Sequence, residues 1–308
     1  MKDIGTLQQV APPSTPTSKV ANSASRSFVP AKRTMMIGEI LLAGQKITAE
    51  QLEQVLELQK SSDLRFGEIA IRQGFVKRED VDRALAIQFG YSSAETEPTV
   101  PASLIAAVAP TAPFAEALRS LRSQLMMRWF DGTPGQTTLA VTSVDRGDGK
   151  SFITANLGVV FSQLGERTLI IDADLRHSTQ HKQFGLRNGL GLSGILSGRA
   201  GLQEVTPVEH FPKLAVLPSG PQPPNPLELL GREEFGLLLN ELSSQFDVIL
   251  VDTPSAQQAA DAQVIAQRAR GVLIVGRKDR TKAPEIAQLA GILSGSGATV
   301  LGTTLNDY

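Results

Sequence analysis

The sequence predicts an α/β fold with a doubly wound, mostly parallel sheet, preceded by a small all-α domain and a disordered N-terminal tail. Two observations predict the sheet. Apolar runs of β type alternate with helical segments, which is typical of parallel βαβ units. Three short motifs rich in glycine or charge follow such runs directly, at residues 146–151, 172–176 and 252–254. Because open α/β sheets bind ligands beyond the carboxyl ends of their strands, we expect one site there.

The composition of the 308 residues excludes several classes of protein. The length suits about two domains. With 30 basic and 31 acidic side chains, the formal charge of −1 gives no reason to expect nucleic-acid binding. Cysteine is absent, which excludes disulfides and thiolate sites and fits the cytoplasm. We find no signal peptide and no apolar run of the roughly 20 residues that span a bilayer. Membrane association is therefore expected only through a partner.

Residues 1–112 are expected to precede the sheet. Residues 1–34 are rich in Pro, Ser, Thr and Ala without a hydrophobic period, so we expect a disordered tail. Residues 35–91 contain an internal repeat, because Ile37-Gly38-Glu39-Ile40 recurs 29 residues later as Phe66-Gly67-Glu68-Ile69. Each unit is expected to form a short helix, a turn and a longer helix. Prolines in residues 92–112 predict an irregular linker.

Residues 113–308 are expected to form the sheet domain. Pro113 begins an amphipathic helix that should run to about Trp129. Strands are expected near Thr138–Val144, Thr168–Asp172, Leu214–Pro218, Val248–Asp252, Val272–Val275 and Thr299–Thr303. Helices are expected after Lys150, Leu227, Gln257 and Ala283. Several of these strands are apolar throughout, as expected when helices cover both faces of a sheet.

The first motif lies between a strand and a helix, as a phosphate-binding loop (P-loop) does. Its glycines let successive backbone N–H groups turn toward an anion, and the helix N-terminus adds partial positive charge. Lys150 would reach the phosphates, and the Ser151 hydroxyl would help hold magnesium. Val144 replaces the usual first glycine, so the loop is a variant, and an ordinary turn is the alternative interpretation. Nucleotide contacts are expected from Arg146, Gly147, Asp148, Gly149, Lys150, Ser151 and Phe152.

The other two motifs supply carboxylates to the same edge. Asp172 and Asp174 alternate after an apolar run, so both would face the site together with Lys150 as catalytic residues. One of them would order magnesium while the other accepts a proton. Magnesium ligands are expected from Ser151, Asp172 and Asp252. A solvated turn at a strand end is the alternative. Taken together, the motifs predict a site for ATP and Mg²⁺.

The segment from about Phe114 to Asn306 resembles the bacterial tyrosine kinases (BY-kinases) of exopolysaccharide synthesis, a branch of the deviant-Walker P-loop ATPases. The stand-alone chain-length-determinant kinases are the most similar subfamily. The most specific string is Pro-Pro-Asn-Pro-Leu-Glu-Leu-Leu at residues 223–230. The resemblance implies a P-loop ATPase domain, with Asp172 and Asp174 in the second Walker motif and Asp252 in the third. Further matching segments lie at residues 116–122, 191–193, 217–220 and 261–262.

The resemblance also implies a biological role and partners. It implies an ATP-dependent tyrosine kinase that regulates exopolysaccharide chain length, polymerisation and export beside a membrane chain-length-determinant protein. Such a protein would be cytoplasmic and peripheral to the inner membrane. A ring-shaped homo-oligomer would form through Glu116, Arg119 and Arg122, for which a solvated charged face is the alternative. The family's C-terminal tyrosine cluster is missing, because Tyr308 and Tyr91 are the two tyrosines of the chain, so Tyr308 is the candidate phosphoacceptor.

Two alternative functions remain open at this point. One is a non-kinase ATPase switch, although the related switches carry a lysine where this loop has Asp145. The other is a scaffold of the same export system that senses cyclic di-GMP or docks a partner. Residues 35–91 weakly resemble the N-terminal domain of type II secretion ATPases, some of which bind cyclic di-GMP. The second repeat unit keeps that pattern, whereas the first has Met36 and Gln45 in place of its arginine and glycine.

Overall fold

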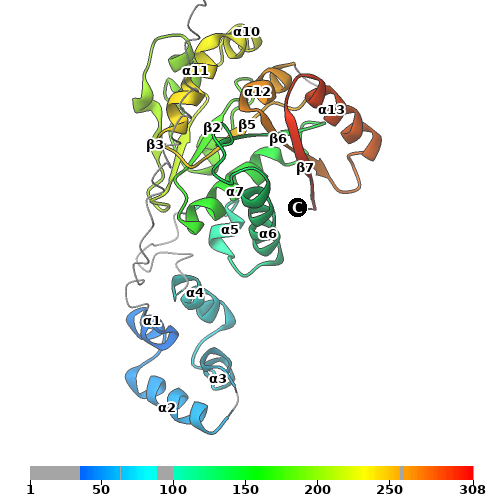
Figure 1. Cartoon of the computed structure of the whole chain (residues 1–308). Coiled ribbons are helices and arrows are strands. Elements are labelled where there is room, and N and C mark those ends of the chain that lie inside the picture. Colours follow the sequence, from blue (N-terminus) through cyan, green and yellow to red (C-terminus); the bar gives the residue numbers. More distant parts are fainter. Residues whose placement is uncertain (1–34, 63, 89–99, 257–259, 308) are drawn as a thin grey trace, which may run out of the picture. The chain divides into compact units, whose positions relative to one another are not determined.

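The computed structural model describes residues 35–62, 64–88, 100–256 and 260–307 (Figure 1). The expected disordered tail, Tyr91 and Tyr308 lie outside these residues. The expected helix after Gln257 is found as α12, which begins at Asp261. Among the described residues, no helix combines the length and apolar character that crossing a membrane requires.

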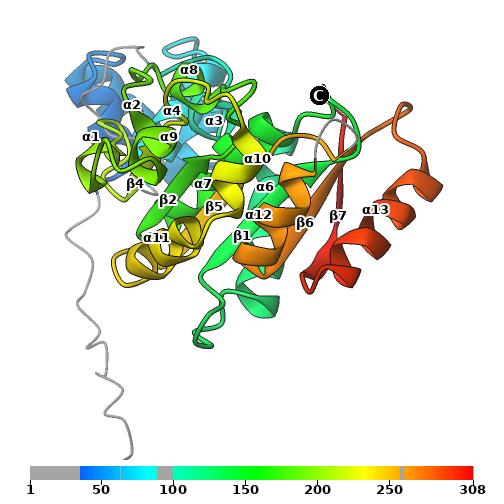
Figure 2. The same ribbon diagram turned by 90° about the horizontal axis from the view of Figure 1, so that it is seen from above.

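The described residues of the C-terminal part form a seven-stranded sheet with the order β3-β4-β2-β5-β1-β6-β7 (Figure 2). Strand β3 pairs antiparallel with β4, and the other strand pairs are parallel. The predicted doubly wound, mostly parallel sheet is therefore confirmed. The strands are β1 (Thr138–Ser143), β2 (Thr168–Asp172), β3 (Thr206–Pro207), β4 (Leu214–Leu217), β5 (Val248–Asp252), β6 (Gly271–Arg277) and β7 (Thr299–Asn306).

Helices cover both faces of this sheet. The evidence is that successive side chains of a strand belong to different hydrophobic clusters, one on each face. In β2, Leu169 and Ile171 belong to one cluster and Ile170 belongs to the other. Helices α5 (Ile105–Val108), α6 (Pro113–Arg128) and α7 (Lys150–Leu164) contribute to the Ile170 side. The opposite side is covered by α9 (Gly191–Leu196), α10 (Pro226–Gly231), α11 (Glu233–Ser243), α12 (Asp261–Ala269) and α13 (Ala283–Gly295).

The sequence analysis did not predict α5, the short helices α8 (Gln180–Gln183) and α9, the 3₁₀ turn Leu202–Glu204 or strand β3. Two of these elements, α5 and β3, show what the sequence signal lacks. The prolines of residues 92–112 predict irregular structure, yet α5 forms there and packs on α7. The side chain of Asn156 explains this helix, because its Oδ1 accepts the N–H of Ala106 and its Nδ2 donates to the carbonyl of Ser103, both at 3.0 Å. The short edge strand β3 was not predicted, since two residues carry no periodic signal. It exists through pairing with β4.

The N-terminal repeat has the predicted form of two helix–turn–helix units. These are α1 (Ile37–Ala43) with α2 (Ala49–Lys60), and α3 (Phe66–Arg72) with α4 (Arg78–Gln88). Equivalent glycines make equivalent contacts: a Cβ on Gly38 would lie 2.6 Å from Leu52, and one on Gly67 would lie 2.6 Å from Val81. The four helices share one hydrophobic cluster drawn from residues 37–87. The repeat is therefore structural as well as sequential.

Phe161 of helix α7 is fully buried, and its ring meets that of Phe130, which follows α6, edge-on at 5.3 Å between centroids. The change Phe161→Ala is expected to lower the free energy of unfolding by about 3–5 kcal/mol, because it removes the ring and leaves a cavity. Denaturant unfolding of the full chain measures this. Leu164→Ala on the same helix is the control, since Leu164 is 48% exposed. Equal losses for both variants would contradict the packing assignment.

Candidate functional site

The loop between β1 and α7 has the backbone of a phosphate-binding loop. Gly147 and Gly149 have φ angles of 91° and 93°, a region that glycine adopts without steric cost. Between them, the fully buried Asp148 accepts the N–H of Asp145 through Oδ2 at 2.9 Å. The side chain of Asp148 thus braces the loop from within, so any contact of this residue with a ligand would come from its backbone. Helix α7 then begins at Lys150, which directs its N-terminus at the same space.

Lys150 is held close to the carboxylates of the second motif. Its Nζ lies 3.5 Å from Oδ2 of Asp174 and 3.4 Å from Oγ of Ser151. The side chains of Lys150 and Asp174 are 11% and 6% exposed, so the pair is largely shielded from water. Asp174 also accepts the N–H of His177 through Oδ1 at 2.9 Å. The predicted catalytic lysine and aspartate are therefore brought together by the fold.

Two further carboxylates lie side by side on neighbouring strands. Asp172 ends β2 and Asp252 ends β5, where they are register partners, and both are fully buried. Oδ2 of Asp172 accepts the N–H groups of Thr179 and Gln180 at 2.9 Å each. Burial and the charge of Asp252 nevertheless raise the pKa of Asp172 to about 8. Burial also raises the pKa of Asp252, against the effect of the Lys150 ammonium.

Gln180 is a site residue that the sequence analysis missed. It is fully buried, and its Nε2 donates to Oδ2 of Asp252 at 2.8 Å and to the carbonyl of Ser151 at 3.0 Å. It thereby links the second and third motifs to the start of α7. The sequence contains no signal for this role, because a glutamine beginning the short helix α8 (Gln180–Gln183) resembles any polar residue in a loop.

Arg176, the last residue of the second motif, is fixed by a residue of α12. Its Nε lies 2.9 Å from Oδ2 of Asp261, which is 1% exposed. This ion pair ties the segment after β2 to the N-terminus of α12. This ion pair explains why Asp261 belongs to one of the segments that carry the family resemblance, because it fixes the chain beside the nucleotide site.

Other predicted residues lie outside the centre of the site. The ring of Phe152 packs on Phe114 at 5.2 Å between centroids, so only its backbone is available to a phosphate. On α6, Arg119 donates to the carbonyl of Pro110 at 2.6 Å, and Arg122 donates to the carbonyl of Val160 at 2.8 Å. Both arginines are thus bound within their own chain. Glu116, which forms an ion pair with Arg119, is 73% exposed.

The residues at the carboxyl edge fit a hydrated magnesium ion carried by phosphates. Ser151, Asp172 and Asp252 offer hydroxyl and carboxylate oxygens, the ligands that Mg²⁺ prefers. Oε1 of Gln180 and Oγ1 of Thr179 are buried there and accept no hydrogen bond from the described residues. Within the described ranges, no group of three or more His, Asp or Glu side chains suits a permanently bound metal.

A glycine loop at a helix N-terminus, a buried lysine and facing carboxylates on a doubly wound sheet define a P-loop nucleotide-binding protein. Residues 139–293 match the CobQ/CobB/MinD/ParA nucleotide binding domain family, CbiA. The chain is 33% identical to tyrosine-protein kinase YwqD of Bacillus subtilis over 204 residues. This alignment covers 66% of this chain and 85% of YwqD. The chain is 36% identical over 169 residues to tyrosine-protein kinase CpsD of Streptococcus agalactiae, covering 54% of this chain and 73% of CpsD.

Solved structures agree with these relatives. The kinase domain of the Escherichia coli tyrosine kinase ETK superposes with a TM-score of 0.62 at 32% identity, over 68% of this chain and 82% of that domain. The chain therefore belongs to the CobQ/CobB/MinD/ParA nucleotide-binding family and, within it, to the bacterial tyrosine-protein kinases. The resemblance inferred from the motifs is confirmed.

The raised pKa of Asp172 predicts how stability depends on pH when nucleotide and metal are absent. An unfolded aspartate releases its proton near pH 3.9. The folded protein keeps the proton up to about pH 8, so stability is lost as the pH rises through this range. Asp172→Asn removes the titrating group and should flatten the decline between pH 5 and 8.5 in thermal melts with a chelator. Glu241→Gln, at an exposed carboxylate of α11, is the control. An unchanged decline in Asp172→Asn would contradict the assignment.

Proposed function

We propose that the chain is an ATP-dependent protein-tyrosine kinase whose cycle regulates exopolysaccharide chain length, polymerisation and export. The observation that carries this proposal is the juxtaposition of Lys150 and Asp174 with the buried pair Asp172 and Asp252 at the phosphate loop. The names of the relatives YwqD and CpsD support the kinase activity. The polysaccharide role rests on the resemblance of the motifs.

The site residues have different proposed roles in phosphoryl transfer. The loop N–H groups and the Lys150 ammonium bind and neutralise the phosphates. Ser151, Asp172 and Asp252 would hold Mg²⁺, which would supply positive charge to neutralise the phosphates. The hydroxyl oxygen of a tyrosine attacks the γ-phosphorus, the bond to the bridging oxygen breaks, and ADP leaves. Asp174 accepts the hydroxyl proton.

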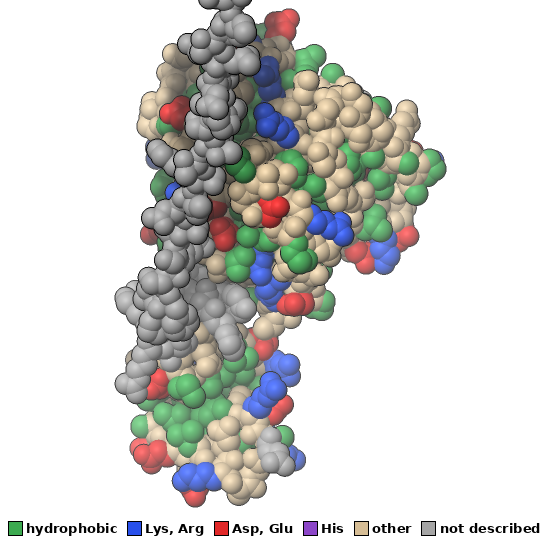
Figure 3. Space-filling model, in the orientation of Figure 1, with side chains coloured by type: hydrophobic (Ala, Val, Ile, Leu, Met, Phe, Trp, Pro, Cys, Tyr) green, Lys and Arg blue, Asp and Glu red, His purple; other side chains and the backbone are tan. Residues whose placement is uncertain are grey.

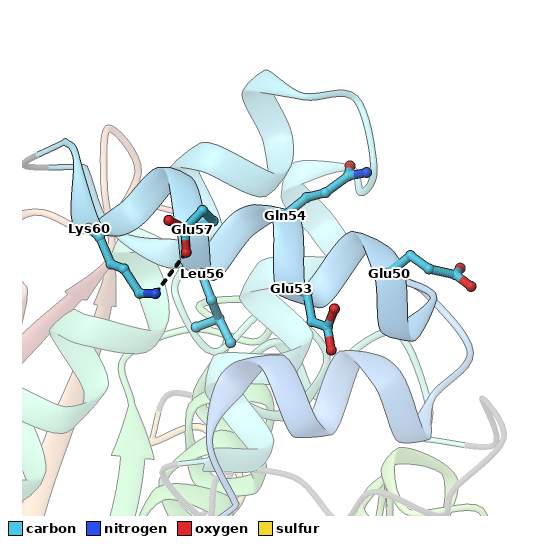
Figure 4. A pocket seen from close by; sticks show the side chains of 6 residues that line it. All are labelled: Glu50, Glu53, Gln54, Leu56, Glu57 and Lys60. Carbon is cyan, nitrogen blue, oxygen red and sulfur yellow. Dashed lines mark hydrogen bonds and ion pairs between the residues drawn. The ribbon is translucent and has the colours of Figure 1, made fainter.

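The N-terminal repeat suits a docking role beside the membrane partner. Hydrophobic side chains gather on one face of this region (Figure 3). Met35 and Met36 are 45% and 64% exposed, and exposed apolar patches commonly mark interaction surfaces. On α2, a shallow depression lined by Glu50, Glu53, Gln54, Leu56, Glu57 and Lys60 adds an acidic surface (Figure 4). We propose that the chain-length-determinant protein contacts this repeat and holds the kinase at the inner membrane.

The change Lys150→Ala tests the site. It removes the ammonium that balances transferred charge, so ADP release from Mg·ATP should fall on the order of a hundredfold or more. The assay reads ADP release and the intact mass of the full chain together. Lys182→Ala, at an exposed lysine of α8, is the matched control and should behave as wild type. Undiminished turnover in Lys150→Ala would overturn the site assignment.

The same assay separates the kinase from the ATPase switch. A gain of one phosphate that Tyr308→Phe abolishes would support a tyrosine kinase with Tyr308 as its acceptor. ADP release without added mass, both alone and with the cytoplasmic segment of a membrane partner, would favour the non-kinase switch.

A ring-shaped homo-oligomer through α6 is part of this proposal. Because Arg119 and Arg122 are engaged within the chain, Glu116 is the exposed member of the predicted trio. Glu116→Lys is expected to shift the Mg·ATP-bound oligomer to monomer in sedimentation velocity, since it reverses a charge at the contact. Glu241→Lys on α11 is the control charge reversal. A species of unchanged size in Glu116→Lys would remove α6 from the interface.

A further inference from the structure

The phosphate loop is held from outside by side chains near the C-terminal end of the chain. Arg280, in the turn between β6 and α13, donates from Nη2 to the carbonyl oxygen of Arg146 at 3.1 Å. Arg277, the last residue of β6, donates from Nη1 to the carbonyl oxygen of Gly147 at 3.1 Å. The carbonyl oxygens of Arg146 and Gly147 therefore both accept hydrogen bonds from arginine side chains of the β6–α13 region.

Asn306, the last residue of β7, binds the next carbonyl of the loop. Its Nδ2 donates to the carbonyl oxygen of Asp148 at 3.1 Å, and the residue is 4% exposed. Its backbone carbonyl accepts the N–H of Lys278 at 3.0 Å, which fixes the end of the strand. A Cβ on Gly149 would overlap the amide of Asn306. Glycine is thus required at 149 both by its φ angle and by the closeness of Asn306.

These contacts have a consequence for the face of the loop that meets a ligand. In a trans peptide the carbonyl and the following N–H point in opposite directions. Holding the carbonyls of residues 146–148 toward β6 and β7 therefore directs the N–H groups of residues 147–149 to the other side. A row of N–H groups pointing the same way is an anion-binding concavity. The concavity lies beside Lys150 and the start of α7.

We propose that Arg277, Arg280 and Asn306 are positioning residues that pre-organise the phosphate loop for the β-phosphate of a nucleoside di- or triphosphate. They act through the loop carbonyls and do not themselves touch the nucleotide. These contacts support a loop that has Val144 where the first glycine usually stands. It also makes the nucleotide site depend on the last strand, since Asn306 lies beyond the family match at residues 139–293. The inference rests on the proposed nucleotide-binding function.

The test compares the full-length wild type with Asn306→Ala and the double variant Arg277→Ala/Arg280→Ala. Hydrogen exchange of peptides spanning residues 144–153 is followed without nucleotide, and the Kd for Mg·ADP is measured by calorimetry. Both variants should exchange faster in the loop, because the carbonyls are released. Loss of a hydrogen bond at each loop carbonyl should weaken Mg·ADP binding by about three- to tenfold. The single variants Arg280→Ala and Arg280→Lys are compared as well, because lysine keeps a donor and should recover most of the affinity that Arg280→Ala loses.

Arg268→Ala is the matched control, because Arg268 also donates to a backbone carbonyl, that of Gly231 at 3.1 Å, away from the loop. It should leave loop exchange and Mg·ADP affinity unchanged. Loop exchange and affinity equal to wild type in both test variants would overturn the positioning role. Losses of thermal stability and Mg·ADP affinity in Arg268→Ala as large as those in the test variants would also overturn the positioning role. Faster loop exchange in a protein whose wild type binds no Mg·ADP would overturn the proposed function and leave the loop restraint standing.

Discussion

The burial of Asp172 and Asp252 as register partners on β2 and β5 is the constraint on which the site depends. Two carboxylates without water repel each other and lose hydration, so the fold must supply donors and positive charge around them. Thr179 and Gln180 donate backbone N–H groups, Gln180 adds its side-chain amide, and Lys150 adds a charge. The elements that carry these donors are arranged around the pair.

The doubly wound sheet makes this arrangement rigid. Strands β1, β2, β4 and β5 are buried throughout, so their ends cannot shift without disturbing two hydrophobic clusters at once. Close contacts reinforce this: a Cβ on Gly158 of α7 would overlap Ile170 of β2. Helix α7 therefore lies close against the sheet, and the loop before it is aimed at the carboxylates. The electrostatic needs of the buried carboxylates and the packing of α7 on the sheet therefore favour the same position of the loop.

The phosphate loop is restrained from two directions. Asp148 braces it from within through the N–H of Asp145, and the carbonyls of residues 146–148 are held by side chains of the C-terminal strands and turn. The internal brace is local in the sequence. The outer restraint joins residues separated by more than a hundred positions, so a nucleotide at this loop would be sensed by β6 and by the edge strand β7.

Local patterns in the sequence determined the strands, the repeat, the loop and the identities of Lys150, Asp172, Asp174 and Asp252. Such features depend on residue type and short spacing, which a single chain displays directly. Only the tertiary structure decided the roles of Gln180, Arg277, Arg280 and Asn306, and the engagement of Arg119 and Arg122 within their own chain. It also produced β3, which exists by pairing with the next strand β4, and α5, which is held by the distant Asn156. The physical reason is common to all: a polar side chain acquires its role from the backbone groups that folding brings within hydrogen-bond distance, and sequence spacing does not encode that distance.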